Sequence, residues 1–160
     1  MLIRPVTSED TAAIWTIIEP VIRAGETLTL DRDMSERDAL VYWFGADKES
    51  FVAEENGVVL GTYYLRANQT GGGAHVANAG YVTGTAATGR GVARAMGQHS
   101  IDHARARGFR AMQFNFVVSS NVRAVGLWQS LGFDIVGRLP GAFDHPAEGF
   151  VDALVMVRAL

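Results

Sequence analysis

Residues 80–94 of the chain read GYVTGTAATGRGVAR. A strand-like run leads there into a glycine-rich turn, and a helical pattern follows directly. Backbone N–H groups at the start of such a helix lack partners and lie at the positive end of the helix dipole, so they favour an anion. Gly89 and Gly91 permit backbone conformations that other residues avoid and let a phosphate approach the main chain. The stretch therefore predicts an anion site, unless its glycines only turn the chain and cap the helix.

Two commoner phosphate motifs do not fit this stretch, because no Gly-Lys-Ser/Thr closes it and it lacks the G-x-G-x-x-G of dinucleotide-binding folds. The charge around it is nevertheless positive. Residues 84–133 carry six arginines and one acid, or +5, whereas the rest of the chain carries eight basic and sixteen acidic residues, or −8. This asymmetry attracts a small anion, unless the arginines are simply solvated on one helix face, while the net charge of −3 disfavours nucleic acid.

Outward from this stretch, the spacing of apolar residues predicts a mixed α/β domain spanning residues 1–160. Helices are expected after the capping residues Thr7 and Ser35, over 92–107 and over 121–131. Asn56-Gly57 predicts a tight hairpin. The expected strands are 2–6, 51–54, 58–65, 75–83, 110–118, 133–138 and 150–157. The order of elements is therefore β-α-α-β-β-β-α-β-α-β-β.

The composition excludes several classes of protein. Without cysteine, the chain has no disulfide, no thiolate metal site and no cysteine nucleophile. No apolar run approaches the ~18 residues of a membrane span, so we expect no membrane partner. The N-terminal residues lack a basic stretch followed by an apolar one, which predicts a cytoplasmic protein.

A second block, residues 121–133, reads NVRAVGLWQSLGF. It is similar to the Asn-x-x-Ala-x-x-Leu/Phe-Tyr-x-x-x-Gly-Phe pattern of the GNAT superfamily of N-acetyltransferases. The first block resembles the acyl-CoA pyrophosphate loop of that superfamily, Gln/Arg-x-x-Gly-x-Gly/Ala: Gly91 and Ala93 fit, and Thr88 stands where Gln or Arg is usual. Residues 136–139 and 151–156 resemble the branch of phosphinothricin and methionine-sulfoximine acetyltransferases, which implies a homodimer.

The resemblance also implies a fold, a co-substrate and a binding site. We expect a single-domain GNAT-like α/β (α+β) fold, with a mixed, mostly antiparallel sheet of about six or seven strands, about four flanking helices, and splayed strands four and five. The co-substrate is acetyl-CoA. Its pantetheine arm would bond to the main chain of Tyr81, Val82 and Thr83 and to Asn121, for which a simple helix N-cap is the alternative. Its pyrophosphate would be held by Thr88, Gly89, Arg90, Gly91, Val92, Ala93 and Arg94.

The catalytic positions depart from the family. Many relatives use a tyrosine of the last helix as the acid that protonates the leaving thiolate, but Trp128 stands there, and an indole cannot serve. The expected strand 75–83 also lacks the glutamate that some relatives use as base, and its His75, Asn78 and Tyr81 remain. Tyr81 and Glu26 are the catalytic candidates. Glu26, in the loop after the first helix, would hold the amine or deprotonate it through water, unless it is an ordinary surface residue.

Three histidines are further candidates for site residues. His99 and His103 lie four apart, a spacing that can bind a metal, but no Glu pair or cysteine accompanies them, so a solvated helix face is favoured and no metal is expected. His145, between the last two strands, would either line the acceptor pocket or form a turn.

These features predict an acetyl-CoA-dependent N-acetyltransferase that acts on the primary amine of a small molecule, an amino acid or analogue, by direct attack in a ternary complex. The lack of cysteine excludes a cysteinyl-acyl intermediate. Two alternatives stay open. One is an acyl-CoA-binding or sensing module that has lost transfer activity, which Trp128 in place of tyrosine favours. The other is a protein N-acetyltransferase, because the net charge of −8 outside residues 84–133 is compatible with a cationic protein acceptor.

Overall fold

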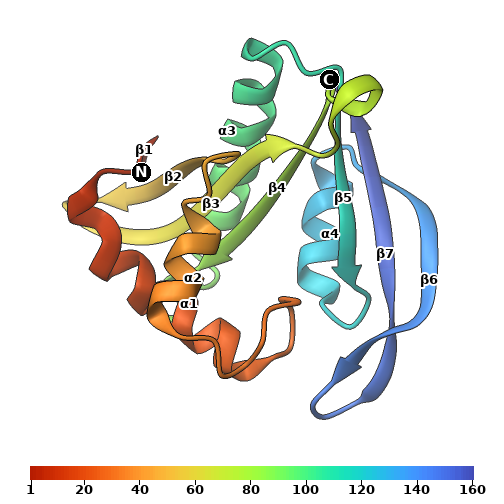
Figure 1. Ribbon diagram of the computed structural model, residues 1–160, viewed down its shortest axis with the longest axis horizontal. Coiled ribbons are helices and arrows are strands. Elements are labelled where there is room, and N and C mark those ends of the chain that lie inside the picture. Colours follow the sequence, from red (N-terminus) through yellow and green to blue (C-terminus); the bar gives the residue numbers. More distant parts are fainter.

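The computed structural model describes residues 1–160 and contains one seven-stranded sheet with the order β1-β2-β3-β4-β5-β7-β6 (Figure 1). All neighbouring strands are antiparallel except β4 and β5. The strands are β1 (Leu2–Pro5), β2 (Glu49–Glu55), β3 (Val58–Ala67), β4 (Val76–Thr83), β5 (Ala111–Val118), β6 (Asp134–His145) and β7 (Gly149–Ala159). The helices are α1 (Thr11–Ala24), α2 (Glu36–Trp43), α3 (Val92–Ala106) and α4 (Val122–Ser130). The predicted fold class is confirmed.

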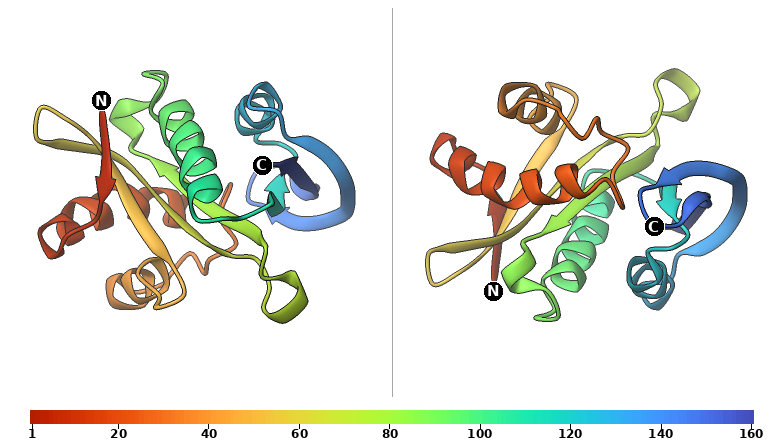
Figure 2. Two further views of the ribbon diagram at one scale, coloured as in Figure 1. Left: turned by 90° about the horizontal axis from the view of Figure 1, so that it is seen from above. Right: turned by 90° about the horizontal axis from the view of Figure 1, so that it is seen from below.

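Two layers of helices cover the sheet, one on each face (Figure 2). The stripe of isoleucines on α1 packs with α2 on one face, around the fully buried Trp43. On the other face, α3 and α4 enclose the larger core, in which Met96 and Ile101 of α3 are fully buried. Because side chains of a strand alternate between faces, β3 and β4 contribute to both cores.

The parallel strands β4 and β5 separate soon after they meet. They pair only at Val76 with Ala111 and at Ala77 with Met112, and Figure 1 shows the gap widening along β4. The pairing of β5 with β7 is also irregular, since the register shifts between Phe114 and Val117. The predicted splaying of the fourth and fifth strands is therefore confirmed, and it opens the centre of the sheet.

Local signals in the sequence account for most boundaries. The Ser35 side chain caps α2 by accepting the N–H of Asp38 at 3.1 Å. Asn56 and Gly57, with φ of 54° and 78°, form the predicted hairpin turn between β2 and β3. Gly108, with φ of 85°, follows the end of α3.

The last two strands are longer than the sequence predicted. The predicted strands 133–138 and 150–157 leave the residues between them, which include Pro140 and Gly141, as a connecting loop. In the structure β6 continues to His145, and the register with β7 shifts between Leu139 and Phe143, which accommodates both residues as an irregularity within the strand. No helix has the length and apolar character needed to cross a membrane.

Candidate active site

The turn before α3 holds several backbone N–H groups without acceptors. Gly89 and Gly91 have φ of 81° and 80°, in the left-handed region that favours glycine. The amides of Thr88 and Arg90 donate to carbonyls within the turn, whereas those of Gly89 and Gly91 donate to none. The helical bonding begins at the carbonyl of Gly91, so the amides of residues 92–94 are also free. At least five N–H groups therefore offer hydrogen bonds to an anion.

The arginines of this turn are only partly available to a ligand. Arg90 forms an ion pair with Glu55 of β2 at 2.5 Å, and its side chain is 49% exposed. Arg94 donates to the hydroxyl of Ser130 at 2.8 Å, which links α3 to α4. The positive potential here thus combines the helix dipole with two surface guanidinium groups.

The free edge of β4 faces the gap toward β5. Gly84 donates its N–H to Leu60 of β3, and backbone groups alternate between the two edges of a strand. Tyr81 and Thr83 therefore present their backbone groups to the gap, where β5 does not pair with them. Val82, by the same alternation, presents its groups to β3, so only its neighbours offer free main chain to a ligand.

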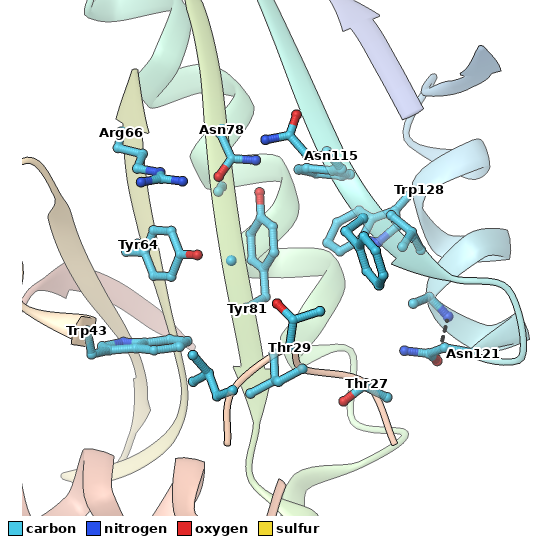
Figure 3. A pocket seen from close by; sticks show the side chains of 18 of the residues that line it. Thr27, Thr29, Trp43, Tyr64, Arg66, Asn78, Tyr81, Asn115, Asn121 and Trp128 are labelled. Atoms are coloured by element: carbon cyan, nitrogen blue, oxygen red, sulfur yellow. Dashed lines mark hydrogen bonds between the residues drawn. The ribbon is translucent and has the colours of Figure 1, made fainter. Parts of the chain in front are cut away.

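A cavity of about 290 Å³ lies where the two strands diverge (Figure 3). Its walls come from β3, β4, β5, α2 and α4, and residues 27–30 of the loop after α1 close one side. The floor near β4 is shaped by Gly80, because a Cβ there would lie 2.7 Å from the ring of Tyr64. Arg66 is the only charged residue in the lining.

Polar side chains of three strands meet in this cavity. Asn78 of β4 pairs in register with Arg66 of β3, and its Nδ2 donates to the carbonyl of Gln113 at 2.9 Å. Asn115 of β5 donates to Asn68 at 2.6 Å. Sequence reasoning missed Arg66 and Asn115 as site residues, although a polar residue inside an otherwise apolar strand was a signal available for both.

The two residues predicted to be catalytic lie apart from this polar group. The Tyr81 side chain points to the α3 face, and its hydroxyl lies 2.7 Å from that of Ser100. Ser100 donates to the carbonyl of Gly97, so Tyr81 is the donor in this pair, and burial raises the pKa of Tyr81. Glu26 is exposed and precedes the loop residues that line the cavity without itself lining it.

Asn121 and Trp128 stand at the α4 side of the cavity. The Oδ1 of Asn121 accepts the N–H of Ala124 at 3.3 Å, which makes Asn121 the N-cap of α4, and its Nδ2 makes no hydrogen bond within the chain (Figure 3). The indole of Trp128 is 7% exposed and packs on Tyr81 and Phe114, with ring centroids 4.7 and 4.8 Å apart. Trp128 is therefore part of the core as well as of the cavity wall.

The three candidate histidines have partners outside the cavity. His99 is hydrogen-bonded to the hydroxyl of Tyr63 at 2.6 Å, and burial lowers its pKa. His103 contacts Glu49 at 2.9 Å. His145 accepts the N–H groups of the two residues after Pro146, so it forms a turn and does not line the cavity. No group of three or more histidine or acidic side chains is arranged to hold a metal ion.

The sequence of this chain is similar to those of known proteins. A family model described as the acetyltransferase (GNAT) family matches residues 13–133. N-acetyltransferase aca1 of Schizosaccharomyces pombe is 29% identical over 98 residues, which are 61% of this chain and 47% of that protein. The chain thus spans about half the length of this curated relative.

Solved structures extend the similarity over the whole chain. A GCN5-related N-acetyltransferase from Kribbella flavida has a TM-score of 0.95 and 42% identity, covering 99% of this chain and 97% of that one. The protein yncA from Salmonella typhimurium, solved with its cofactor acetyl-CoA, has a TM-score of 0.87 and 25% identity, covering 100% and 94%. The chain therefore belongs to the acetyltransferase (GNAT) family, whose enzymes use acetyl-CoA as the acetyl donor.

Proposed function

We propose that the chain transfers the acetyl group of acetyl-CoA to the amine of a small molecule, an amino acid or an analogue, by direct attack in a ternary complex. The amine nitrogen forms a bond to the thioester carbonyl carbon, the carbon–sulfur bond breaks, and CoA leaves as the thiol once a proton from the amine has been passed on. The observation that carries the proposal is the cavity of about 290 Å³ at the point where β4 and β5 part. Its size suits a small molecule.

Backbone groups hold the co-substrate in this proposal. The free amides of Gly89, Gly91 and residues 92–94 bind the pyrophosphate, because they are unpaired and lie at the positive end of α3. Tyr81 and Thr83 bond to the pantetheine arm through their main chain. Asn121 adds its free Nδ2 from the opposite side of the gap, in addition to capping α4.

In this mechanism the amine proton is transferred to water rather than to a fixed side chain. No carboxylate lines the cavity, and the hydroxyl proton of Tyr81 is engaged with Ser100. Tyr81 therefore acts through its backbone and its ring, which packs on Trp128. Glu26, which directly precedes the loop residues that line the cavity, is proposed only as the end of a water relay.

A panel of amines assayed for thiol release with acetyl-CoA tests the proposal, together with calorimetry of CoA binding. We expect CoA binding and thiol release with at least one small amine. CoA binding without release for any amine would favour the acyl-CoA-sensing module instead. Release only with peptides carrying a free N-terminus would favour a protein N-acetyltransferase.

We also propose that the protein is a cytoplasmic homodimer of the phosphinothricin-type branch, as the resemblance implies. The outer strand β6 has a free edge, and Val136 and Phe150 on the β6–β7 pair are 61% and 78% exposed. An edge strand with exposed apolar side chains favours association with a second copy. Sedimentation equilibrium at micromolar concentration is expected to give twice the chain mass, and a monomer mass would refute the dimer.

A further inference from the structure

We propose that Arg66 binds a carboxylate of the acceptor, so that the acetylated amine belongs to a molecule that also carries a carboxylate. This rests on the proposed function in one respect, namely that the cavity takes the acceptor. Arg66 is the only charged residue among those that line the cavity, and neither an acid nor a histidine accompanies it there. The lining thus carries a single positive charge.

The backbone register brings Arg66 beside the polar groups of the cavity. Arg66 of β3 is directly opposite Asn78 of β4, and both side chains lie on the face covered by α1 and α2. Figure 3 shows the guanidinium extending from β3 toward Asn78, above the ring of Tyr64. Neighbouring cross-strand side chains on one face are close enough to contact the same small ligand.

Most of the hydrogen-bonding capacity of Arg66 is unused. Its Nε is the one buried side-chain nitrogen or oxygen in the chain without a hydrogen-bond partner. The side chain makes one ion pair, between Nη1 and Asp47 at 3.4 Å, a distance longer than that of an ordinary hydrogen bond. A guanidinium has five N–H donors in a planar fork that matches the two oxygens of a carboxylate. Arg66 therefore has donors left for a bidentate pair.

The nearby acid does not cancel this charge within the cavity. Asp47 is 58% exposed and lies 3.2 Å from the ammonium group of Lys48, which is the main cause of its lowered pKa. In the cavity itself, a cationic group of a ligand would meet Arg66 with no carboxylate to offset the repulsion. The Oδ1 of Asn78, whose Nδ2 is held by Gln113, offers a neutral acceptor for the amine N–H. The lining thus selects an anion at one point and an amine at the next.

The test compares the twenty common L-amino acids with their carboxamides, which differ by the charge of one group. For the wild type we expect kcat/KM for at least one amino acid to exceed that for its amide by about 10-fold or more, the worth of a charge-assisted pair. Arg66→Gln should reduce kcat/KM for the acid by about 10- to 100-fold and leave the amide within about threefold. Arg66→Lys, which keeps the charge but loses the fork, should recover part of the loss.

Controls separate this inference from folding and from the proposed function. Arg37 is an exposed arginine of α2 whose side chain makes no hydrogen bond or ion pair, so Arg37→Gln should change none of these values, and Arg66→Gln should keep the wild-type affinity for CoA. Calorimetric titration of the same amino acids into the CoA complex measures acceptor binding without transfer. Binding that depends on Arg66, without thiol release, would sustain the inference and refute the proposed function. Equal use or equal binding of acid and amide by the wild type, or an equal loss of both in Arg66→Gln, would overturn the inference.

Discussion

The two sides of the gap between β4 and β5 are built in different ways. On the α3 side, the proposed anion site consists of the free backbone amides of one short stretch, those of Gly89, Gly91 and residues 92–94. On the α1–α2 side, the cavity takes its polar groups from the side chains of Arg66, Asn78 and Asn115, which lie on three different strands. A site made of consecutive backbone is visible as a local pattern, whereas a site made of distant side chains exists only after the strands have paired.

The largest effect is expected from Gly91→Val in the backbone-built side. At φ of 80° a β-branched residue is strained, and its side chain would stand among the free amides. We expect CoA affinity, measured by calorimetry, to fall by about 100-fold. Gly108→Val, with φ of 85° at the other end of α3, imposes the same strain far from the site and should leave CoA affinity unchanged. An equal loss in both variants would mean that strain alone, and not the amides, governs binding.

Gly80→Ala is expected to affect acceptor binding in the cavity without affecting CoA binding at the α3 turn. The new Cβ would lie 2.7 Å from the Tyr64 ring, so the cavity wall must shift. The acceptor KM should rise by about 10-fold, while CoA affinity stays within about twofold. Gly137→Ala in β6, where the nearest atom is an ordinary 3.6 Å away, is the matched control. If Gly80→Ala weakened CoA binding by the same factor as it raised the acceptor KM, the two sides of the gap would not be independent.

Trp128→Phe tests whether the residue shared by both sides takes part in chemistry. The indole packs on Tyr81 and Phe114, and its N–H is far too weakly acidic to protonate a thiolate, so we expect a structural loss of about 1–3 kcal/mol in the free energy of unfolding. The value of kcat should stay within about threefold of wild type at a temperature where the variant is folded. A fall in kcat of about 100-fold with unchanged CoA affinity would show that Trp128 is needed for transfer.

The smallest effect concerns pH and stability on the α3 side. Burial first, and then the charge of His103, lowers the pKa of His99 in the folded state below the unfolded value near 6.5. The unfolded chain then binds more protons in this range, so stability is present above pH 6.5 and falls as the pH drops below it. Protonation of His99 should lower the Tm by no more than about 3 °C between pH 7.5 and pH 5.5.

His99→Gln should flatten that part of the pH dependence. Since no histidine or acid lines the cavity, the same variant should leave acceptor selectivity unchanged. A change in selectivity with His99→Gln would link the α3 core to the acceptor side.

Prediction from sequence succeeded where the signal was local. The glycine-rich turn, the capping Ser35 and the Asn56-Gly57 hairpin each act through neighbouring residues, and each has the predicted form. The prediction failed at residues 140–145, where Pro140 and Gly141 are typical of a turn but pairing with β7 keeps the chain extended, and it held at residues 146–148, which form the turn. The alternative reading of His145 as a turn residue, rather than a pocket residue, is the one the structure supports.

The sequence by itself indicated the family and the group of free amides proposed to bind an anion, because a strand, a glycine turn and a helix in succession place free amides at one point wherever they occur. Only the tertiary structure decided what surrounds the acceptor. Arg66 and Asn78 are twelve residues apart, and Asn115 is farther still, yet strand pairing sets the first two side by side and the divergence of β4 from β5 leaves space beside them. Their common orientation follows from register, which depends on the packing of the whole sheet.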